Sequence, residues 1–146
     1  MHWTDTNWVL LDANLRRSEF VGAAADRLGL GDRVRVLHER AENAGREASL
    51  RYRFDLVVAR GFGPPAVTAE CASPFLRPGG RILVSEPPTS TEGRWSASGL
   101  TTLGLRSERR TETGSGAASF QLLEQIEPCP DRFARRVGIP RKRPLW

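Results

Sequence analysis

The stretch Asn7-Trp8-Val9-Leu10-Leu11-Asp12 is a short apolar run that ends in a carboxylate, and a helical pattern follows it at once. A buried parallel strand has this pattern when an acidic residue sits at its carboxyl end. In open α/β sheets, ligands bind in the crevice outside the carboxyl ends of the strands. Asp12 could accept hydrogen bonds from both hydroxyls of a ribose, because a carboxylate has enough lone pairs for two donors. Alternatively, Asp12 or Asn14 caps the following helix, and the segment alone leaves both roles open.

The size and composition of the chain fit a single globular domain. Its 146 residues are 39% hydrophobic and 27% charged, which is ordinary usage for a domain with one core. No apolar run is long enough to span a bilayer, and residues 1–5 lack the basic and apolar regions of a signal peptide. Cys71 and Cys129 are isolated, so they predict neither a disulfide framework nor a metal site. We expect a cytoplasmic protein with reduced thiols.

The charge balance is basic. The formal net charge is +5 and the isoelectric point is about 10.5. A basic surface favours an anionic partner such as RNA, although an excess of this size also occurs on surfaces that only keep a protein soluble. Charge therefore raises the expectation of RNA binding only slightly.

Strand and helix patterns alternate through the first part of the chain, which predicts βαβ units and a mainly parallel α/β sheet. Gly29 stands just after the helix expected over residues 14–28, where glycine often ends a helix. Pro64 and Pro65 can begin the helix expected over residues 64–72. We expect strands over residues 7–12, 33–37, 54–59 and 81–85, and helices over residues 14–28, weakly over 39–49, and over 64–72.

The last third of the chain changes character. A short helix over residues 95–103 precedes two strands, 104–113 and 118–127, which flank Gly114-Ser115-Gly116 and predict an antiparallel hairpin. Beyond Pro128 the chain is basic and shows no regular pattern. We divide the chain into a domain over residues 1–130 and a basic C-terminal tail over residues 131–146. A disordered charged terminus and an RNA-binding segment are equal alternatives for this tail.

A parallel βα run closed by an antiparallel hairpin is the pattern of class I S-adenosylmethionine-dependent methyltransferases, and several blocks resemble one family of them. Leu10-Leu11-Asp12-Ala13-Asn14 with Arg16, Arg17 and Phe20 resembles the LLDS-x-x-K-R-x-x-F-L block of the RsmG family, also called glucose-inhibited division protein B. Further blocks follow in family order across nearly the whole chain. They are Arg40-Ala41-Glu42, the stretch from Phe54 to Phe62, the weaker L-R-P-G-G-R at residues 76–81, and the basic stretch from Arg135 to Leu145.

The resemblance implies a Rossmann-like enzyme that transfers a methyl group from S-adenosylmethionine to N7 of a guanine in 16S ribosomal RNA, with ribosomal RNA or the small ribosomal subunit as its partner. Asp12 matches the acid that binds the cofactor ribose, and Ala41 and Glu42 match the segment beside the adenine. Arg60 matches the arginine near the methyl-transfer site. Simpler roles stay open, a solvated loop charge for Glu42 and an ion pair at a strand end for Arg60. We expect RNA contacts from Arg16, Arg17, Arg135, Arg136, Arg141, Lys142 and Arg143. Such contacts can be made to phosphates, and phosphate contacts carry no sequence information.

The residues of the chain are consistent with the chemistry that this reaction requires. Guanine N7 is already a nucleophilic lone pair, so no proton must be removed before attack, and the sulfonium supplies the leaving group. An enzyme for this reaction needs mainly to position its substrates. The chain shows no obvious general base, since His2 and His38 are its only histidines and neither lies in a matched block.

Two departures from the family pattern bear on function. Family members place a first strand and a glycine-rich cofactor loop upstream of the ribose acid, and too few residues precede Asp12 here for either. That strand is central in the family, so we expect the strands ending at Asp12 and Arg60 to face a gap or to pair with each other. Both strands are strongly apolar, so we expect them at central and not at edge positions. The chain should then be marginally stable or self-associate. Glu86 stands where many members have lysine, and an acid there would repel phosphate.

Three functions follow from the matches and the departures. The first is an RsmG-type methyltransferase that is truncated at its N-terminus, and the second is a non-catalytic RNA-binding remnant. The third is an interaction module whose incomplete sheet is filled by another chain. In each case we expect this chain alone to bind S-adenosylmethionine weakly or not at all.

Overall fold

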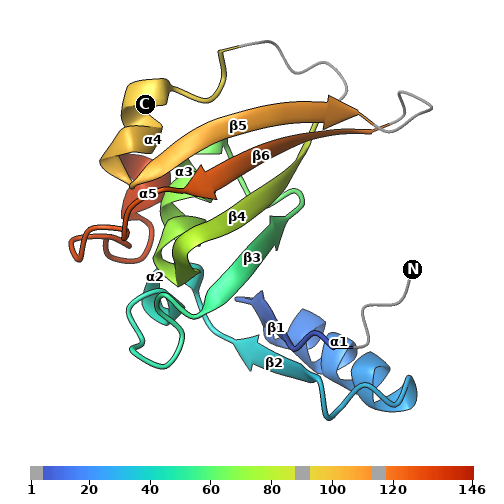
Figure 1. The fold of residues 1–146 in the computed structure, drawn as a ribbon. Helices are drawn as coiled ribbons and strands as arrows, with labels where there is room; N and C mark the ends of the chain where they lie inside the picture. The colour runs from blue at the N-terminus through green and yellow to red at the C-terminus, as the bar shows by residue number, and fades with distance from the viewer. Residues whose placement is uncertain (1–4, 88–92, 113–117) are drawn as a thin grey trace. The chain divides into compact units, whose positions relative to one another are not determined.

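A computed structural model describes residues 5–87, 93–112 and 118–146. The chain divides into two compact units, residues 1–41 and residues 42–146. Each unit has its own sheet, with two strands in the first and four in the second. Figure 1 labels the helices and strands along the chain.

The first unit is a βαβ element. Strand β1 (Trp8–Asp12) pairs in parallel with β2 (Val34–His38), and helix α1 (Leu15–Arg27) connects them. The helix begins where the Asn14 side chain accepts a hydrogen bond from the Arg17 backbone N–H at 3.1 Å. It ends before Gly29, whose φ of +66° is a conformation that glycine adopts without a steric penalty. The predicted strands and helix of this unit are therefore confirmed.

The apolar face of α1 is covered only in part. Ala25 is buried, and Val21 and Ala24 are half-buried. At the same time, Phe20 is 74% exposed and Leu28 is 71% exposed. A pair of strands is too narrow to cover a whole helix face, so the small side chains pack inward and the bulky ones stay at the rim.

The second unit is built on one mixed sheet in the order β3-β4-β6-β5. Strand β3 (Phe54–Ala59) is parallel to β4 (Leu76–Glu86), whereas β6 (Ser119–Gln125) is antiparallel to both β4 and β5 (Leu105–Glu112). The hairpin strands are thus confirmed, and the predicted turn at residues 114–116 lies outside the described residues. Residues 76–80, part of the L-R-P-G-G-R block, form an irregular start of β4, because the register with β3 shifts there.

Helices gather at one end of this sheet (Figure 1). Helix α3 (Pro65–Ala72) contacts both α4 (Ala97–Thr102) and α5 (Ile139–Lys142), and a 3-10 turn at Ser73–Phe75 follows α3. The short helix α2 (Ala41–Ala44) occupies the start of the segment predicted as weakly helical. Every α3 residue after Pro65 is buried, so α3 is the central helix of this unit.

The core of the second unit includes the end of the chain. Leu76, Ile82 and Leu123 from the sheet are fully buried together with Cys129. Phe133 belongs to the same cluster and is only 3% exposed. The segment predicted as an irregular basic tail therefore folds into this unit.

The expected arrangement of the strands ending at Asp12 and Arg60 is wrong in one respect. Within the described residues β1 pairs only with β2, and β3 pairs only with β4, so the two strands do not pair with each other. Their apolar sequences led us to expect central positions, yet each is the outer strand of its own sheet. None of their residues is fully buried, because no further described strand covers them.

Candidate cofactor and RNA-binding site

Asp12 stands at the carboxyl end of β1, where the sequence places it. Its Oδ1 accepts the Asn14 backbone N–H at 2.8 Å. Arg17 binds the same carboxylate with two N–H groups, Nε to Oδ2 at 2.7 Å and Nη2 to Oδ1 at 2.9 Å. The cap of α1 is Asn14 and not Asp12, so the capping alternative for Asp12 does not hold.

The surroundings of Asp12 favour its charged form. The hydrogen bond from Arg17 lowers the pKa of the Asp12 carboxyl most, and the Asn14 N–H lowers it further. The Asp12 side chain remains 35% exposed. The result is a stable anion that is open to solvent at a strand end. The paired Arg17, predicted to contact RNA, is engaged with Asp12, while Arg16 is exposed.

Ala41 and Glu42 stand at the start of α2, on either side of the division between the two units. The Glu42 side chain is not a solvated loop charge, because the residue is only 5% exposed. Its Oε1 accepts the Gly138 backbone N–H at 3.0 Å. This contact joins the predicted adenine-side segment to the C-terminal tail, a link that sequence spacing did not indicate.

Arg60 follows the last residue of β3 and is exposed. It forms no ion pair with any residue in the described ranges, so the ion-pair alternative for Arg60 does not hold there. Phe62, two residues further on, is 51% exposed. The carboxyl end of β3 therefore presents a cation and an aromatic ring to solvent.

Glu86 does not present an unbalanced charge at the end of β4. Its side chain is only 5% exposed. It accepts Arg94 Nη1 at 2.5 Å and the Trp95 indole N–H at 2.9 Å. The pairing with Arg94 reduces the reason to expect that this acid repels phosphate, because its charge is compensated within the protein.

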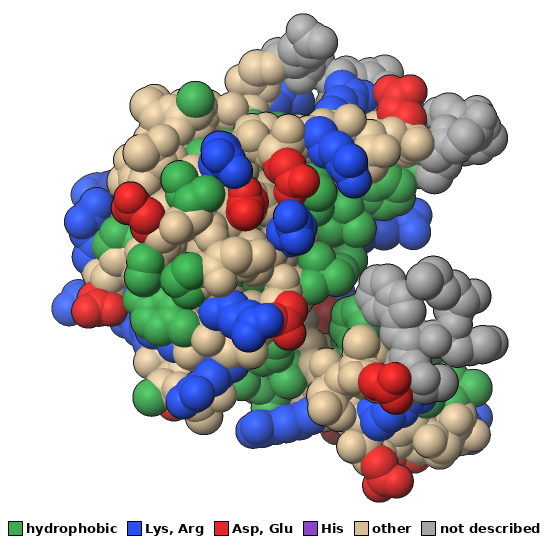
Figure 2. Space-filling model, viewed as in Figure 1, with side chains coloured by type: hydrophobic (Ala, Val, Ile, Leu, Met, Phe, Trp, Pro, Cys, Tyr) green, Lys and Arg blue, Asp and Glu red, His purple; other side chains and the backbone are tan. Residues whose placement is uncertain are grey.

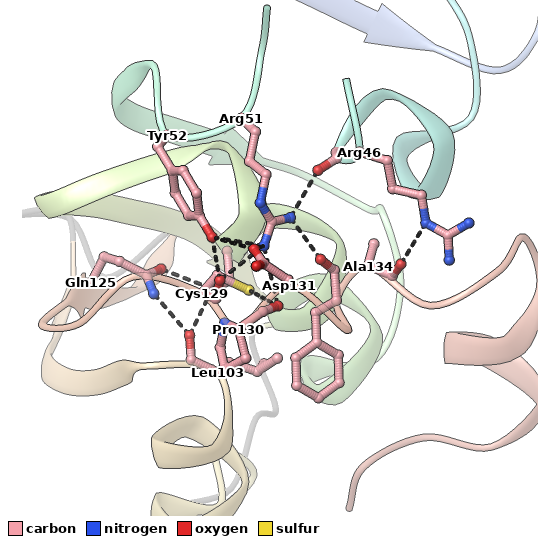
Figure 3. Close-up of polar contacts among 12 residues, drawn as sticks. Arg46, Arg51, Tyr52, Leu103, Gln125, Cys129, Pro130, Asp131 and Ala134 are labelled. Carbon is pink, nitrogen blue, oxygen red and sulfur yellow. Dashed lines mark hydrogen bonds and ion pairs between the residues drawn. The ribbon is translucent and has the colours of Figure 1, made fainter. Parts of the chain in front are cut away.

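The C-terminal tail is held by Arg51, a residue that the sequence analysis did not single out. Its guanidinium donates to the backbone carbonyls of Gly45, Cys129, Pro130 and Phe133 at 2.6–3.1 Å. The neighbouring Tyr52 hydroxyl also donates to the Cys129 carbonyl, at 2.5 Å. Figure 3 shows both side chains pointing at the same segment, from Cys129 to Asp131, where the tail begins. Arg51 therefore links the loop before β3 to the tail.

A buried ion pair fixes the tail a second time. Glu70 lies on α3 with no exposed surface. Arg135 donates to it through Nε at 2.7 Å, Nη2 at 2.5 Å and its backbone N–H at 3.2 Å. Arg135 thus acts as a structural partner here. The sequence did contain a signal for this pair, since Glu70 is a charged residue inside a mostly apolar helix. Buried carboxylates are rare unless they are paired, so Glu70 could have been expected to have a basic partner.

The remaining predicted RNA contacts of the tail lie at the surface. Arg136, Arg141, Lys142 and Arg143 are exposed, and no acidic residue follows Asp131 in the chain. On the face in view in Figure 2, basic side chains alternate with acidic and apolar ones and do not merge into one patch. By sequence, residues 131–146 have six basic residues and one acidic residue, a net charge of +5 that equals the formal net charge of the whole chain.

No three His, Cys, Asp or Glu side chains in the described part of the chain lie close enough together to hold a metal ion. Among the helices that the structure describes, none has the length and apolarity to cross a membrane. Cys129 is buried, and this burial raises the pKa of its thiol.

Comparison with known proteins decides the family. The family model for rRNA small subunit methyltransferase G, GidB, matches residues 1–92, which is more than half of the chain. The chain belongs to this family. Relatives named ribosomal RNA small subunit methyltransferase G match nearly the whole of this chain. The protein of Deinococcus deserti is 35% identical over 93% of the chain, and that of Chloroflexus aggregans is 36% identical over 93%.

These relatives are longer than this chain. The chain spans 57% of the Deinococcus deserti protein and 58% of the Chloroflexus aggregans protein. Among solved structures, a Galdieria sulphuraria protein described as a sarcosine dimethylglycine methyltransferase aligns with a TM-score of 0.64 at 9% identity, over 82% of this chain and 70% of its own. A Clostridium thermocellum protein described as an rRNA methylase aligns with a TM-score of 0.59 at 15% identity, over 83% and 73%. These likenesses establish the class I methyltransferase fold.

Proposed function

We propose that this chain supplies the ribose, adenine and RNA side of an enzyme that methylates guanine N7 in 16S ribosomal RNA, with S-adenosylmethionine as the methyl donor. One observation carries the proposal. Asp12 stands at the carboxyl end of a parallel strand, in a chain whose residues 1–92 match the methyltransferase G family. Ligands of open α/β sheets bind at this end of the strands.

The residues around Asp12 fit a ribose. Three N–H donors already reach the carboxylate, and a carboxylate offers about four acceptor positions. One position is therefore open for a ribose hydroxyl, and the exposed Arg17 must withdraw an N–H group to open a second. Because Glu42 is occupied by Gly138, the backbone of Ala41 and Glu42 is the part that remains for the adenine. When bound, S-adenosylmethionine supplies a methyl group activated on a sulfonium.

The RNA side needs positioning groups and no base. Guanine N7 carries its own lone pair, so the protein has only to hold the base in line with the methyl group. Arg60 and Phe62, both exposed after β3, suit this role through phosphate or base contacts and stacking. The exposed cations of the tail suit phosphate contacts.

The test uses the longer relatives. The N-terminal part of the Deinococcus deserti protein that precedes the matched region would be fused ahead of this chain. Calorimetry would measure S-adenosylmethionine binding to the fused and the unfused chain, and methyl transfer to unmethylated small subunits would be mapped at guanine N7. We expect weak or no binding by the unfused chain and clear binding by the fusion, because only the fusion includes the family's glycine-rich loop.

The site assignment has its own variant. In the fused chain, Asp12→Ala should weaken S-adenosylmethionine binding by about 1–3 kcal/mol, the usual cost of leaving a polar group without its partner. The matched control is Asp32→Ala, which removes an exposed acid from the same unit. Equal affinities for the two variants would contradict the ribose role. RNA binding without methyl transfer by the fusion would favour a non-catalytic RNA-binding protein instead.

A further inference from the structure

A shallow hollow of about 250 Å³ opens in the second unit, next to the start of α3. Its lining combines rigid apolar rings with two arginines. Pro64 and Pro65 contribute to the lining from the start of α3, which follows β3 and Arg60 in the chain. The C-terminal tail contributes Arg141, Pro144 and Trp146. The lining residues are Pro64, Pro65, Ala66, Val67, Arg94, Arg141, Pro144 and Trp146.

The tryptophan in this hollow is held firmly in place. The Trp146 indole N–H donates to the Arg94 carbonyl at 3.1 Å. Its ring packs so closely on Gly99 of α4 that a Cβ built at Gly99 would lie 2.0 Å from the ring. The polar group of Trp146 is therefore satisfied inside the protein. What the ring offers to the hollow is a fixed aromatic surface.

The two arginines differ in charge balance. Arg94 is paired with the buried Glu86, so its charge is compensated. Arg141 is exposed and has no ion-pair partner in the described part of the chain. The hollow thus combines a flat aromatic surface, proline rings and one uncompensated cation at its margin.

We propose that this hollow holds one unpaired base of a single-stranded RNA, with the adjacent phosphate bound by Arg141. The proposal rests on the proposed function, because it names a further contact of the same RNA. Single-stranded nucleic acids are bound by bases stacked on aromatic side chains and phosphates held by cations. The hollow is slightly smaller than the ~300–1,000 Å³ of pockets for drug-sized ligands, which suits a single base.

The charge of the tail favours RNA over a protein partner. The segment after Asp131 has six basic residues and no acidic one. Arg136, Lys142 and Arg143 are exposed beside Arg141 in the chain. A polyanion meets this charge along its whole length, whereas a proline-rich peptide would use only the apolar rings.

The first experiment reports on Trp146 directly in the full 146-residue chain. The probe is a six-nucleotide single-stranded RNA, compared with the same oligonucleotide carrying one central abasic position. The indole N–H signal of Trp146 in an NMR spectrum, assigned with Trp146→Phe, should shift with the intact RNA and shift less with the abasic one. The Trp95 indole, which donates to Glu86, is the internal reference and should stay unchanged.

The second experiment measures affinity by fluorescence anisotropy at fixed salt. Arg141→Gln should weaken binding of the intact RNA several-fold. It should also lower the slope of log affinity against log salt concentration by the amount that corresponds to about one lost phosphate contact. Arg53→Gln removes an equal charge at the amino end of β3 and should change affinity less than twofold. The abasic RNA should bind the wild-type chain on the order of tenfold more weakly than the intact RNA, and Trp146→Ala should abolish this difference if its melting curve shows that it folds.

Several outcomes would overturn the proposal. Equal affinity for intact and abasic RNA with an unmoved Trp146 signal would show that no base enters the hollow. A Trp146 shift with a polyproline peptide, but not with RNA, would make the hollow a protein-binding site. Methyl transfer by the fused chain with no effect of Arg141→Gln on RNA affinity would reject the hollow and leave the proposed function standing. Tighter binding of the intact RNA than of the abasic RNA, without methyl transfer by the fused chain, would support the hollow as a base site and contradict the proposed function.

Discussion

At the scale of single residues, two of the side chains that looked functional in the sequence, Glu42 and Arg135, have structural partners. Glu42 accepts a tail N–H, and Arg135 neutralises the buried Glu70. A buried charge without a partner costs several kcal/mol. These residues are therefore constrained by stability whatever their part in binding.

The Glu70–Arg135 pair gives the clearest prediction of stability. Arg135→Met leaves a fully buried carboxylate unpaired and should lower the free energy of unfolding by about 3 kcal/mol, near the lower end of the range for broken buried pairs because Arg135 is partly exposed. The double variant Arg135→Met with Glu70→Gln should recover much of this loss, since the charge is gone and an acceptor for the residue 135 N–H remains. Urea unfolding would measure both, and an equal loss in the single and double variants would show that the pair's charge is irrelevant.

The Asp12–Arg17 pair predicts a pH dependence with a definite sign. Because the folded protein depresses the pKa of the Asp12 carboxyl, the pair stabilises the first unit above the unfolded pKa of about 3.9. This contribution is lost as the pH falls through the lower folded pKa. An NMR titration of the Asp12 carboxyl carbon should show a midpoint below the ordinary value, and Arg17→Gln should raise it. Arg16→Gln, which removes a neighbouring cation, should leave it nearly unchanged.

At the scale of elements, the C-terminal segment is both a part of the core and the main carrier of unbalanced charge. Phe133 packs in the core. Arg51 donates to four backbone carbonyls, of which that of Phe133 lies in the tail and those of Cys129 and Pro130 lie just before it. Deleting the tail would therefore disturb folding and binding together. Neutralising only its exposed cations separates the two effects.

We predict that Arg136→Gln, Lys142→Gln and Arg143→Gln together leave the melting temperature nearly unchanged but weaken RNA binding. The log–log salt slope should fall by up to about 2, since each lost contact with a single strand removes roughly 0.7. The matched control is Arg27→Gln, Arg53→Gln and Arg109→Gln, which removes the same charge from exposed positions outside the tail. Similar slopes for the two triple variants would show that net charge alone matters.

At the scale of the whole molecule, the sheet of each unit has an edge strand, β1 or β3, that pairs on one side only within the described residues. Neither β1 nor β3 has a second partner strand within the described residues. Val58 on β3 is 54% exposed. An exposed apolar edge strand is a template for pairing with another chain.

The open strand predicts concentration-dependent self-association of the isolated chain. Sedimentation velocity should show the average mass rising with protein concentration, and Val58→Lys should reduce the effect, because a charge on an edge strand opposes pairing. Thr111→Lys, on the strand at the other edge of this sheet, is the control. A monomer at all concentrations would mean that the open edge of β3 is protected in another way.

Several features could be predicted from the sequence because they depend on local patterns. The apolar run ending at Asp12, the Asn14 cap and Gly29 define the first βαβ element through hydrogen bonds between near neighbours. The alternation of strands and helices, with a closing hairpin, is likewise a local signal. The family followed from blocks whose order is written in the sequence.

The tertiary structure alone decided which partners the charges have. Glu70 is 65 residues from Arg135 and Glu42 is 96 residues from Gly138, and no periodicity links positions so far apart. In the sequence Arg51 likewise looks like an ordinary charged residue of a loop, and only the structure shows its contacts with distant backbone carbonyls. The basic tail looked irregular because its order comes from burial and from side-chain contacts with distant backbone carbonyls, and its short helix is only a small part of that order. Long-range packing therefore determined that this segment is part of the core as well as a candidate RNA surface.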